Sequence, residues 1–310
     1  MIKDLVEGNS VVNLVVYCTN KTTATSVKGE YYALTLQDAS GTISGRVWDI
    51  NEYIEDFEIK DYINIYGTVT SYKGILQINI SNLTKVDPST VNIDDFCPKA
   101  PRPIEDMWSE FIDIVNSVEN EYLSKLLHAF FDNEKIVSKF KLHSAAKVVH
   151  HAYVGGLLDH SLSVAKICQT LADNYPIINR DLLITSAVLH DIGKIKELSA
   201  FPENDYTDEG NLLGHIYMGA EMIDIQVRKI EGFPKTLANE VKHCILAHHG
   251  EMEYGSPKVP ALIEAMALSF ADDTDAKLRR FSDLLADAPD DEWSKGSDHF
   301  LNSKFRKTII

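Results

Sequence analysis

The sequence lacks the features of secreted, membrane-spanning or disulfide-rich chains. It has no CxxC pair, and its four cysteines lie more than 70 residues apart, at Cys18, Cys97, Cys168 and Cys244. This spacing excludes a disulfide framework and a zinc–thiolate site, and it indicates reduced thiols. No apolar run reaches the about 18 residues needed to span a membrane, and the N-terminus MIKDLVEGNS has no apolar signal-peptide core. We therefore expect a cytoplasmic protein with no membrane segment.

Positive charge is also scarce. The chain has 30 Lys and Arg residues against 46 Asp and Glu residues, a net charge of −16 over 310 residues. Such a chain does not bind nucleic acid simply by neutralising phosphates with a basic surface. Any phosphate chemistry must therefore depend on a few placed basic side chains or on metal ions. With 45% hydrophobic residues, the composition is otherwise that of a globular protein of about two domains.

Residues 1–88 are predicted to form an all-β domain. Segments rich in Val, Ile, Thr and Tyr alternate with short turns, at 11–19, 31–39, 42–50, 62–72 and 75–83. So many strands in so short a domain favour a small closed barrel, because an open sheet would leave exposed edges. The stretch LTLQDASGTISGRVWD resembles an OB-fold of the nucleic-acid-binding, anticodon-binding type. An SH3-like barrel has the same pattern and is the alternative.

Residues 89–105 are predicted to be a linker, because four prolines and few periodic apolar residues occur in PSTVNIDDFCPKAPRPIE. From 106 to 310, apolar residues recur at the three- and four-residue spacing of amphipathic helices. The predicted fold class is therefore multidomain, an N-terminal all-β OB-fold barrel followed by an all-α domain.

Histidines are confined to the helical part. None of the eleven occurs in the first 127 residues, and nine lie between 143 and 249. The clearest candidate site is His190–Asp191 in VLHDIGKIKE, at the end of a predicted helix that Gly193 is placed to terminate. An imidazole beside a carboxylate suits Mn, Fe, Co, Zn or Mg, and the partial negative charge of a helix C-terminus favours a cation. A His-Asp dipeptide also occurs by chance, so the pair alone does not establish a metal site.

Further histidines and aspartates accompany this pair on separate predicted helices. They are His160 in LLDHSLSVAK, His215 in LLGHIYMG, His248 and His249 in ILAHHG, and Asp272 and Asp273 in LSFADDTDAKL. The order H…HD…H…HH…D resembles the HD-domain superfamily of metal-dependent phosphohydrolases. The resemblance to its two-metal branch implies one divalent ion held by His160, His190, Asp191 and Asp272, and a second held by Asp191, His215 and His248.

Two choices within that set depend on neighbouring residues. Asp272 is preferred to Asp273 because it follows Ala271 in the AD dipeptide usual for the last ligand. His248 is preferred to His249 because it lies closer to the apolar run ILA. His249 is left with three possible roles, as a ligand, a phosphate contact or a helix cap.

The whole chain resembles the YhaM family of 3′→5′ exoribonucleases, in which an OB-like barrel precedes an HD domain. Family-like stretches run along its length: LTLQDASGTISGRVWD, VNIDDF, HHAYVGGLLDHSLSVAK, LHDIGKIKELS, EGNLLGHI, LAHHGEMEYGSPKVP and DDTDAKL. The resemblance implies hydrolysis of single-stranded RNA from the 3′ end to nucleoside 5′-monophosphates, and it leaves single-stranded DNA open as an additional substrate. It also implies two divalent ions, Mn²⁺ foremost and otherwise Co²⁺, Fe²⁺ or Mg²⁺.

The implied ligand set defines the expected catalytic residues. Two cations bridged by Asp191 would activate a water for in-line attack on the terminal phosphodiester. Lys194 is expected to contact the phosphate, with an exposed lysine at a helix end as the alternative. His150 and His151 are expected either to line the substrate cleft or to be partly buried polar residues.

The barrel is expected to bind the strand. OB-folds stack bases on aromatic side chains beside a basic groove. The candidates are Tyr31, Trp48, Arg46 and Lys73, with Tyr32, Tyr66, Tyr72 and Lys28 in addition. About half of these aromatic residues must lie in the core of so small a barrel.

Two other functions share parts of this pattern. One is an HD-type phosphodiesterase acting on cyclic or small nucleotides, which has little need of a strand-binding barrel. The other is a non-catalytic single-strand-binding protein with a vestigial HD site. The sequence does not predict the oligomeric state, and a homo-oligomer is among the possibilities.

Overall fold

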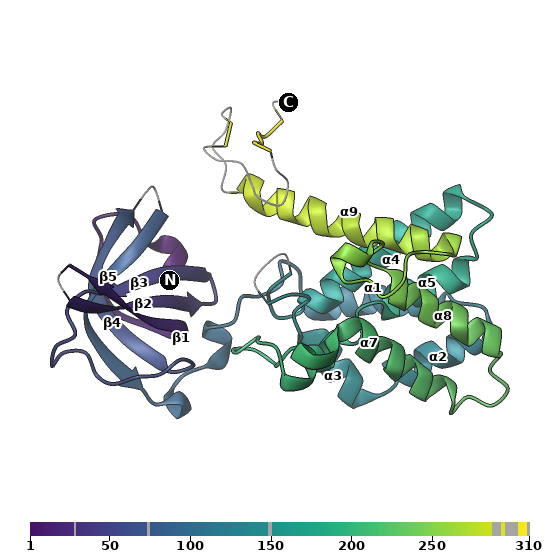
Figure 1. Cartoon of the computed structure of the whole chain (residues 1–310), viewed down its shortest axis with the longest axis horizontal. Coiled ribbons are helices and arrows are strands. Elements are labelled where there is room, and N and C mark those ends of the chain that lie inside the picture. Colours follow the sequence, from purple (N-terminus) through teal and green to yellow (C-terminus); the bar gives the residue numbers. More distant parts are fainter. Residues whose placement is uncertain (28, 73–74, 148–150, 287–292, 295–302, 309–310) are drawn as a thin grey trace. The chain divides into compact units, whose positions relative to one another are not determined.

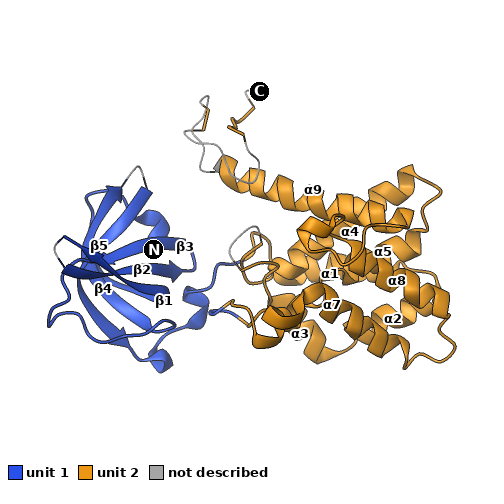
Figure 2. Ribbon diagram, in the orientation of Figure 1, with its two compact units in different colours: residues 1–99, 201–203 blue, residues 100–200, 204–310 orange. Residues whose placement is uncertain are grey.

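The computed structural model describes all residues except 28, 73–74, 148–150, 287–292, 295–302 and 309–310. The predicted site residues Lys73 and His150, together with Lys28, lie outside the described residues. The chain divides into two compact units, 1–99 with 201–203, and 100–200 with 204–310 (Figure 2).

The first unit is a five-stranded closed barrel (Figure 1). Its strands are β1 (Ser10–Ser26), β2 (Gly29–Asp38), β3 (Gly41–Val47), β4 (Tyr62–Tyr72) and β5 (Ile75–Val86), in the order β1-β2-β3-β5-β4. All neighbours are antiparallel except β3 and β5. Along β3, Ile43, Gly45 and Val47 are buried and alternate with partly exposed residues, as expected for one face on a core. The predicted barrel is confirmed.

Strand β1 is much longer than the predicted 11–19 segment. Its C-terminal part, from Tyr17 to Ser26, pairs with β2, whereas Ser10 to Tyr17 pairs with β4. One strand therefore belongs to two strand pairs. A register shift between Cys18 and Asn20, just after the change of partner at Tyr17, allows the strand to bend there, and a second shift lies between Val11 and Leu14. The pattern of β-forming residues finds the central part of such a strand but not its ends.

The barrel unit extends beyond the predicted boundary at residue 88. The segment predicted as a linker contains two short 3₁₀ helices, η2 (Pro88–Thr90) and η3 (Ile93–Asp95). After them the buried ring of Phe96 lies 4.8 Å from that of Tyr62, and Gln37 donates a hydrogen bond to the Phe96 carbonyl. The burial of this ring attaches the segment to the barrel, up to residue 99.

The second unit is helical. Its elements are α1 (Ile104–Asn116), α2 (Glu121–Phe131), α3 (Glu134–Leu142), α4 (Gly156–Asn174), α5 (Arg180–Leu189), α6 (Lys194–Glu197), α7 (Asp208–Val227), α8 (Lys235–Ala247), η4 (Met252–Tyr254) and α9 (Ile263–Ala286). Helix α5 is buried along residues 182–189 and contacts α1, α2, α4, α8 and α9. A helix that is buried on all sides lies in the middle of a core, so the residues that directly follow α5 lie deep in the unit. Within the described residues, no helix is long and apolar enough to cross a membrane.

Candidate metal centre

The His190–Asp191 pair directly follows the buried helix α5. His190 is the C-terminal cap of α5, and both side chains are almost completely buried. Gly193 does not terminate the helix through a left-handed conformation, as its predicted role would suggest, because its φ is −64°. Instead, a Cβ at this position would lie 2.1 Å from the His215 carbonyl oxygen. Glycine is needed here because α7 passes so close to the backbone.

Four side chains from three segments form the first group of potential ligands. The Nε2 atom of His160 on α4 lies 3.1 Å from Nε2 of His190 and 3.1 Å from Oδ1 of Asp272 on α9. Oδ2 of Asp191 lies 3.5 Å from the His160 Nε2 and 3.4 Å from the His190 Nε2. The predicted members of the first metal site therefore converge on one point.

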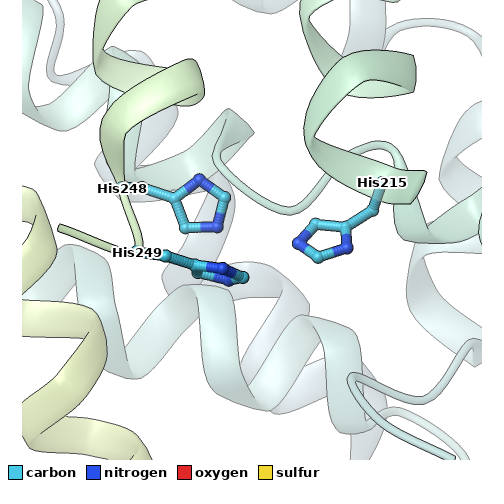
Figure 3. Close-up of side chains that lie close together, drawn as sticks. All are labelled: His215, His248 and His249. Carbon is cyan, nitrogen blue, oxygen red and sulfur yellow. The ribbon is translucent and has the colours of Figure 1, made fainter. Parts of the chain in front are cut away.

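Three imidazoles form the second group (Figure 3). His215 comes from α7, and His248 and His249 follow α8, with ligand atoms within 4.8 Å of one another. The Nε2 atoms of His215 and His248 lie 3.5 and 3.8 Å from Oδ1 of Asp191. The two oxygens of the Asp191 carboxylate therefore face different groups, Oδ2 toward the first and Oδ1 toward the second.

The histidine rings are oriented by hydrogen bonds at Nδ1. In each of five rings this atom lies 2.7–3.0 Å from an acceptor. The acceptor is a carboxylate for His160 (Asp275) and His215 (Glu197). It is a backbone carbonyl for His190 (Ala187), His248 (Ile245) and His249 (Tyr254). Carbonyls and carboxylates only accept hydrogen bonds, so Nδ1 carries the hydrogen. A neutral ring then presents the Nε2 lone pair as a metal ligand.

Three buried atoms at the centre have no hydrogen-bond partner among the residues that the structure describes. They are Asp191 Oδ1, His215 Nε2 and His248 Nε2. A buried polar atom left unpaired costs free energy, and native structures rarely leave several together. All three are atoms that coordinate divalent cations, and they face one another. The residues present therefore fit the metal ions that an HD domain implies.

The buried ligands have pKa values shifted away from their ordinary values, and the direction differs between residues. Burial lowers the pKa of His248 well below its ordinary value, so the ring is neutral, as a ligand must be. Burial alone would raise the pKa of Asp191, but the positive charge of Lys194 holds it well below the usual range. Burial would also lower the pKa of His160, but hydrogen bonds with Asp272 and Asp275 outweigh it and raise that pKa to about 10. His160 must therefore release a proton when it binds a cation.

Lys194 lies inside the centre rather than at an exposed helix end. Its ammonium nitrogen is 2.7 Å from Asp191 Oδ2, and its side chain is 15% exposed. Burial would lower its pKa, but the charge of Asp191 raises it. Lys194 is thus a fixed positive charge beside the ligand groups.

Asp275 is a functional candidate that the sequence reasoning missed. It lies three residues after Asp272 on α9, and its carboxylate accepts hydrogen bonds from His160, His151 and Ser163. His151 is 1% exposed, so its ring is held on Asp275 in the interior and is not at a cleft surface. The three-residue spacing from Asp272 was the available signal, since it puts both carboxylates on one helix face.

Glu197 is the second missed residue, and no local pattern identifies it. Helix α7 is kinked at Gly214, whose φ of 72° suits glycine, and His215 begins the part beyond the kink. One oxygen of Glu197 accepts a hydrogen bond from the His215 backbone N–H at 2.9 Å and lies 3.0 Å from the ring Nδ1. Glu197 therefore fixes both the helix start and the ring.

A cavity of about 650 Å³ opens in front of the two ligand groups. His160, Asp191, His248 and Asp272 lie in its wall, together with Lys194, Lys277, Asp273 and Tyr254. Asp273 is turned away from the ligands and pairs with Lys277 at 2.8 Å, with half of its side chain exposed. The described structure thus brings Asp272, and not Asp273, into the ligand group.

The barrel presents aromatic and basic candidates on the outer face of β2, β3 and β5. The rings of Tyr31 and Trp48 are 4.5 Å apart, and Trp48 donates a hydrogen bond to Asn79. Arg46 is half-buried in β3, and Trp48, 48% exposed, lies directly after the end of that strand. Of the others, Tyr32 packs against the core, Tyr66 is half-buried and Tyr72 is exposed.

Comparisons with known proteins match both units. The HD domain model matches residues 157–277, and the OB-fold nucleic acid binding domain model matches residues 12–86. Three similar proteins are each named 3′-5′ exoribonuclease YhaM. The Bacillus subtilis protein is 33% identical over 89% of this chain and 88% of its own length. The Listeria innocua protein is 32% identical over 93% of this chain and 92% of its own length. The Bacillus velezensis protein is 35% identical over 80% of this chain and 79% of its own length.

Proposed function

Because the chain belongs to the YhaM family of 3′-5′ exoribonucleases, we propose that it is a metal-dependent 3′-5′ exoribonuclease acting on single-stranded RNA. The observation that carries this proposal is the position of the Asp191 carboxylate, with one oxygen toward each ligand group. Two-metal phosphoesterases need such a bridge, because paired cations stabilise the attacking and leaving oxygens together.

We propose that His160, His190, Asp191 and Asp272 hold one cation, and that Asp191, His215 and His248 hold the other, with His249 beside them. When bound, such ions supply Lewis-acid stabilisation and lower the pKa of a water. Water adds to the terminal phosphorus, the P–O3′ bond to the penultimate ribose breaks, and the departing O3′ takes up a proton to become a hydroxyl. The products are a nucleoside 5′-monophosphate and a strand shortened by one residue. The Lys194 ammonium then neutralises part of the negative charge on the phosphoryl oxygens.

The donor set supports Mn²⁺ as the proposed metal. Imidazoles and carboxylates without thiolates suit Mn²⁺, Co²⁺ and Fe²⁺, whereas Mg²⁺ prefers oxygen ligands and retained waters. We further propose that the enzyme acts in the cytoplasm. The four cysteines are all buried and unpaired, which agrees with a reducing compartment.

The test is an end-labelled single strand incubated with the protein and Mn²⁺. A ladder that shortens from the 3′ end, with release of 5′-monophosphates, is the expected result, and chelation by EDTA should stop it. DNA and cyclic nucleotides are run in parallel. Turnover of cyclic nucleotides without strand shortening would replace the proposal with the small-nucleotide phosphodiesterase. Binding without hydrolysis would leave a non-catalytic strand-binding protein.

Replacing Trp48 with alanine should weaken binding of long strands. One base–aromatic stacking contact contributes about 1–3 kcal/mol, so KM on a long RNA should rise by about 5- to 160-fold, with kcat little changed. Tyr53→Ala is the matched control, because Tyr53 is an aromatic residue of the same unit that is 60% exposed. Equal KM values for wild type and Trp48→Ala would show that this face does not hold the strand.

Replacing Glu197 with glutamine should weaken metal binding through His215. The amide keeps the side-chain size but removes the charge that orients the ring, and such changes cost about 10- to 100-fold in metal affinity or activity. The measurement is Mn²⁺ titration by calorimetry, with Glu209→Gln at the start of α7 as the control. An unchanged affinity in Glu197→Gln would exclude His215 from the ligand set.

A further inference from the structure

An apolar groove adjoins the metal-centre cavity. It measures about 260 Å³, and its apolar lining comes from Tyr254, Val259, Pro260, Met266 and Phe270; we call it the Tyr254–Phe270 groove. Five residues line both the groove and the main cavity: His249, Tyr254, Ser269, Asp273 and Lys277. The groove is therefore a continuation of the space in front of the metal ligands.

The groove exposes large apolar side chains that the core does not use. Tyr254 is 66% exposed and Phe270 is 62% exposed. On the same helix α9, Leu268 and Ala271 are buried, so Phe270 projects away from the core while its neighbours face it. A group of exposed apolar residues around one hollow marks a binding surface more often than a structural need.

The groove and the cavity together match the two parts of a nucleotide. The cavity has cationic side chains and metal ligands, which suit a phosphate, whereas the groove has aromatic and aliphatic surface, which suits a flat base. Lys277 borders both spaces and pairs there with Asp273 at 2.8 Å, so the cationic side chain nearest the metal ligands is Lys194 in the cavity wall. Small-molecule sites commonly occupy about 300–1,000 Å³, so the groove by itself accommodates only part of a ligand.

We propose that the Tyr254–Phe270 groove holds a nucleobase flanking the scissile phosphodiester, stacked on Tyr254 or Phe270. This inference rests on the proposed exonuclease function and adds a base subsite in the helical unit to the strand-binding face of the barrel. Aromatic faces accept every base, so the subsite provides grip without sequence preference.

The test combines a protein substitution with a substrate lacking one base. kcat/KM is measured for wild type and Phe270→Ala on a short RNA, and on the same RNA with a base-free ribose at either of the two positions flanking the scissile bond. Phe270→Ala should lower kcat/KM on the intact RNA by about tenfold. On the RNA that lacks the contacted base, Phe270→Ala should lower kcat/KM far less, because the ring has no base to stack on. Tyr254→Ala is the second variant; it removes the ring but keeps the carbonyl that orients His249.

Tyr175→Ala is the matched control. Tyr175 is 57% exposed at the end of α4 and is absent from the lining of both spaces. Equal losses for Phe270→Ala on intact and base-free RNA, while wild type shortens the strand, would overturn the groove proposal and leave the exonuclease intact. If Phe270→Ala loses kcat/KM equally on both RNAs and also differs from wild type in oligomeric state, the groove is instead a contact surface between copies of the chain. Failure of wild type to shorten any strand would overturn both proposals.

Discussion

Replacing Asp191 with asparagine should lower kcat/KM on single-stranded RNA by about 10³-fold or more. Asp191 is the one described side chain whose two carboxylate oxygens face both ligand groups, at 3.4–3.8 Å from four imidazole nitrogens. The substitution removes the negative charge shared by both cations. Metal ions contribute several kcal/mol to phosphoryl transfer, and about 4 kcal/mol corresponds to about 10³-fold in rate.

The measurement is the rate of 3′ shortening at saturating Mn²⁺. Asparagine has nearly the volume of aspartate, so circular dichroism should show an unchanged helix content. Activity within about tenfold of wild type in a fully folded Asp191→Asn protein would reject the bridged two-metal scheme.

Adjacent aspartates on α9 should differ sharply in their effects. Asp272→Asn should lower kcat/KM on single-stranded RNA by about 100-fold or more. The Asp272 carboxylate lies 3.1 Å from the His160 Nε2 within the first ligand group. Asp273→Asn should stay within about fivefold, because Asp273 forms an exposed pair with Lys277, and such pairs contribute at most about 1 kcal/mol.

The pair of variants is its own control, since both make the same chemical change at neighbouring positions. Manganese affinity should follow the same order as activity. A larger effect of Asp273→Asn than of Asp272→Asn would move the last ligand to Asp273 and would require α9 to be rotated relative to the structure.

The sequence predicts those parts of the molecule that depend on local pattern. The alternation in β3 and the three- and four-residue spacing in α1 and α2 identify element type, because burial of one face imposes the period. The order of histidines and aspartates identifies the ligand candidates, because each stands in a short stretch of its own. The family resemblance indicates which of these candidates share a metal ion.

The remaining features depend on packing between distant segments. Phe96 attaches the predicted linker to the barrel, but only the position of Tyr62 makes this burial possible. Glu197 orients His215 only because Gly214 kinks α7, and Gly193 is needed only because α7 passes over it. None of these contacts has a signature within its own stretch of sequence.

The most direct test of the central claim is anomalous X-ray scattering from crystals grown with Mn²⁺. The account predicts two manganese peaks about 3.5–4 Å apart, one among His160, His190 and Asp272 and the other among His215, His248 and His249, with the Asp191 carboxylate between them. A single peak away from Asp191, or manganese bound only elsewhere on the protein, would contradict it.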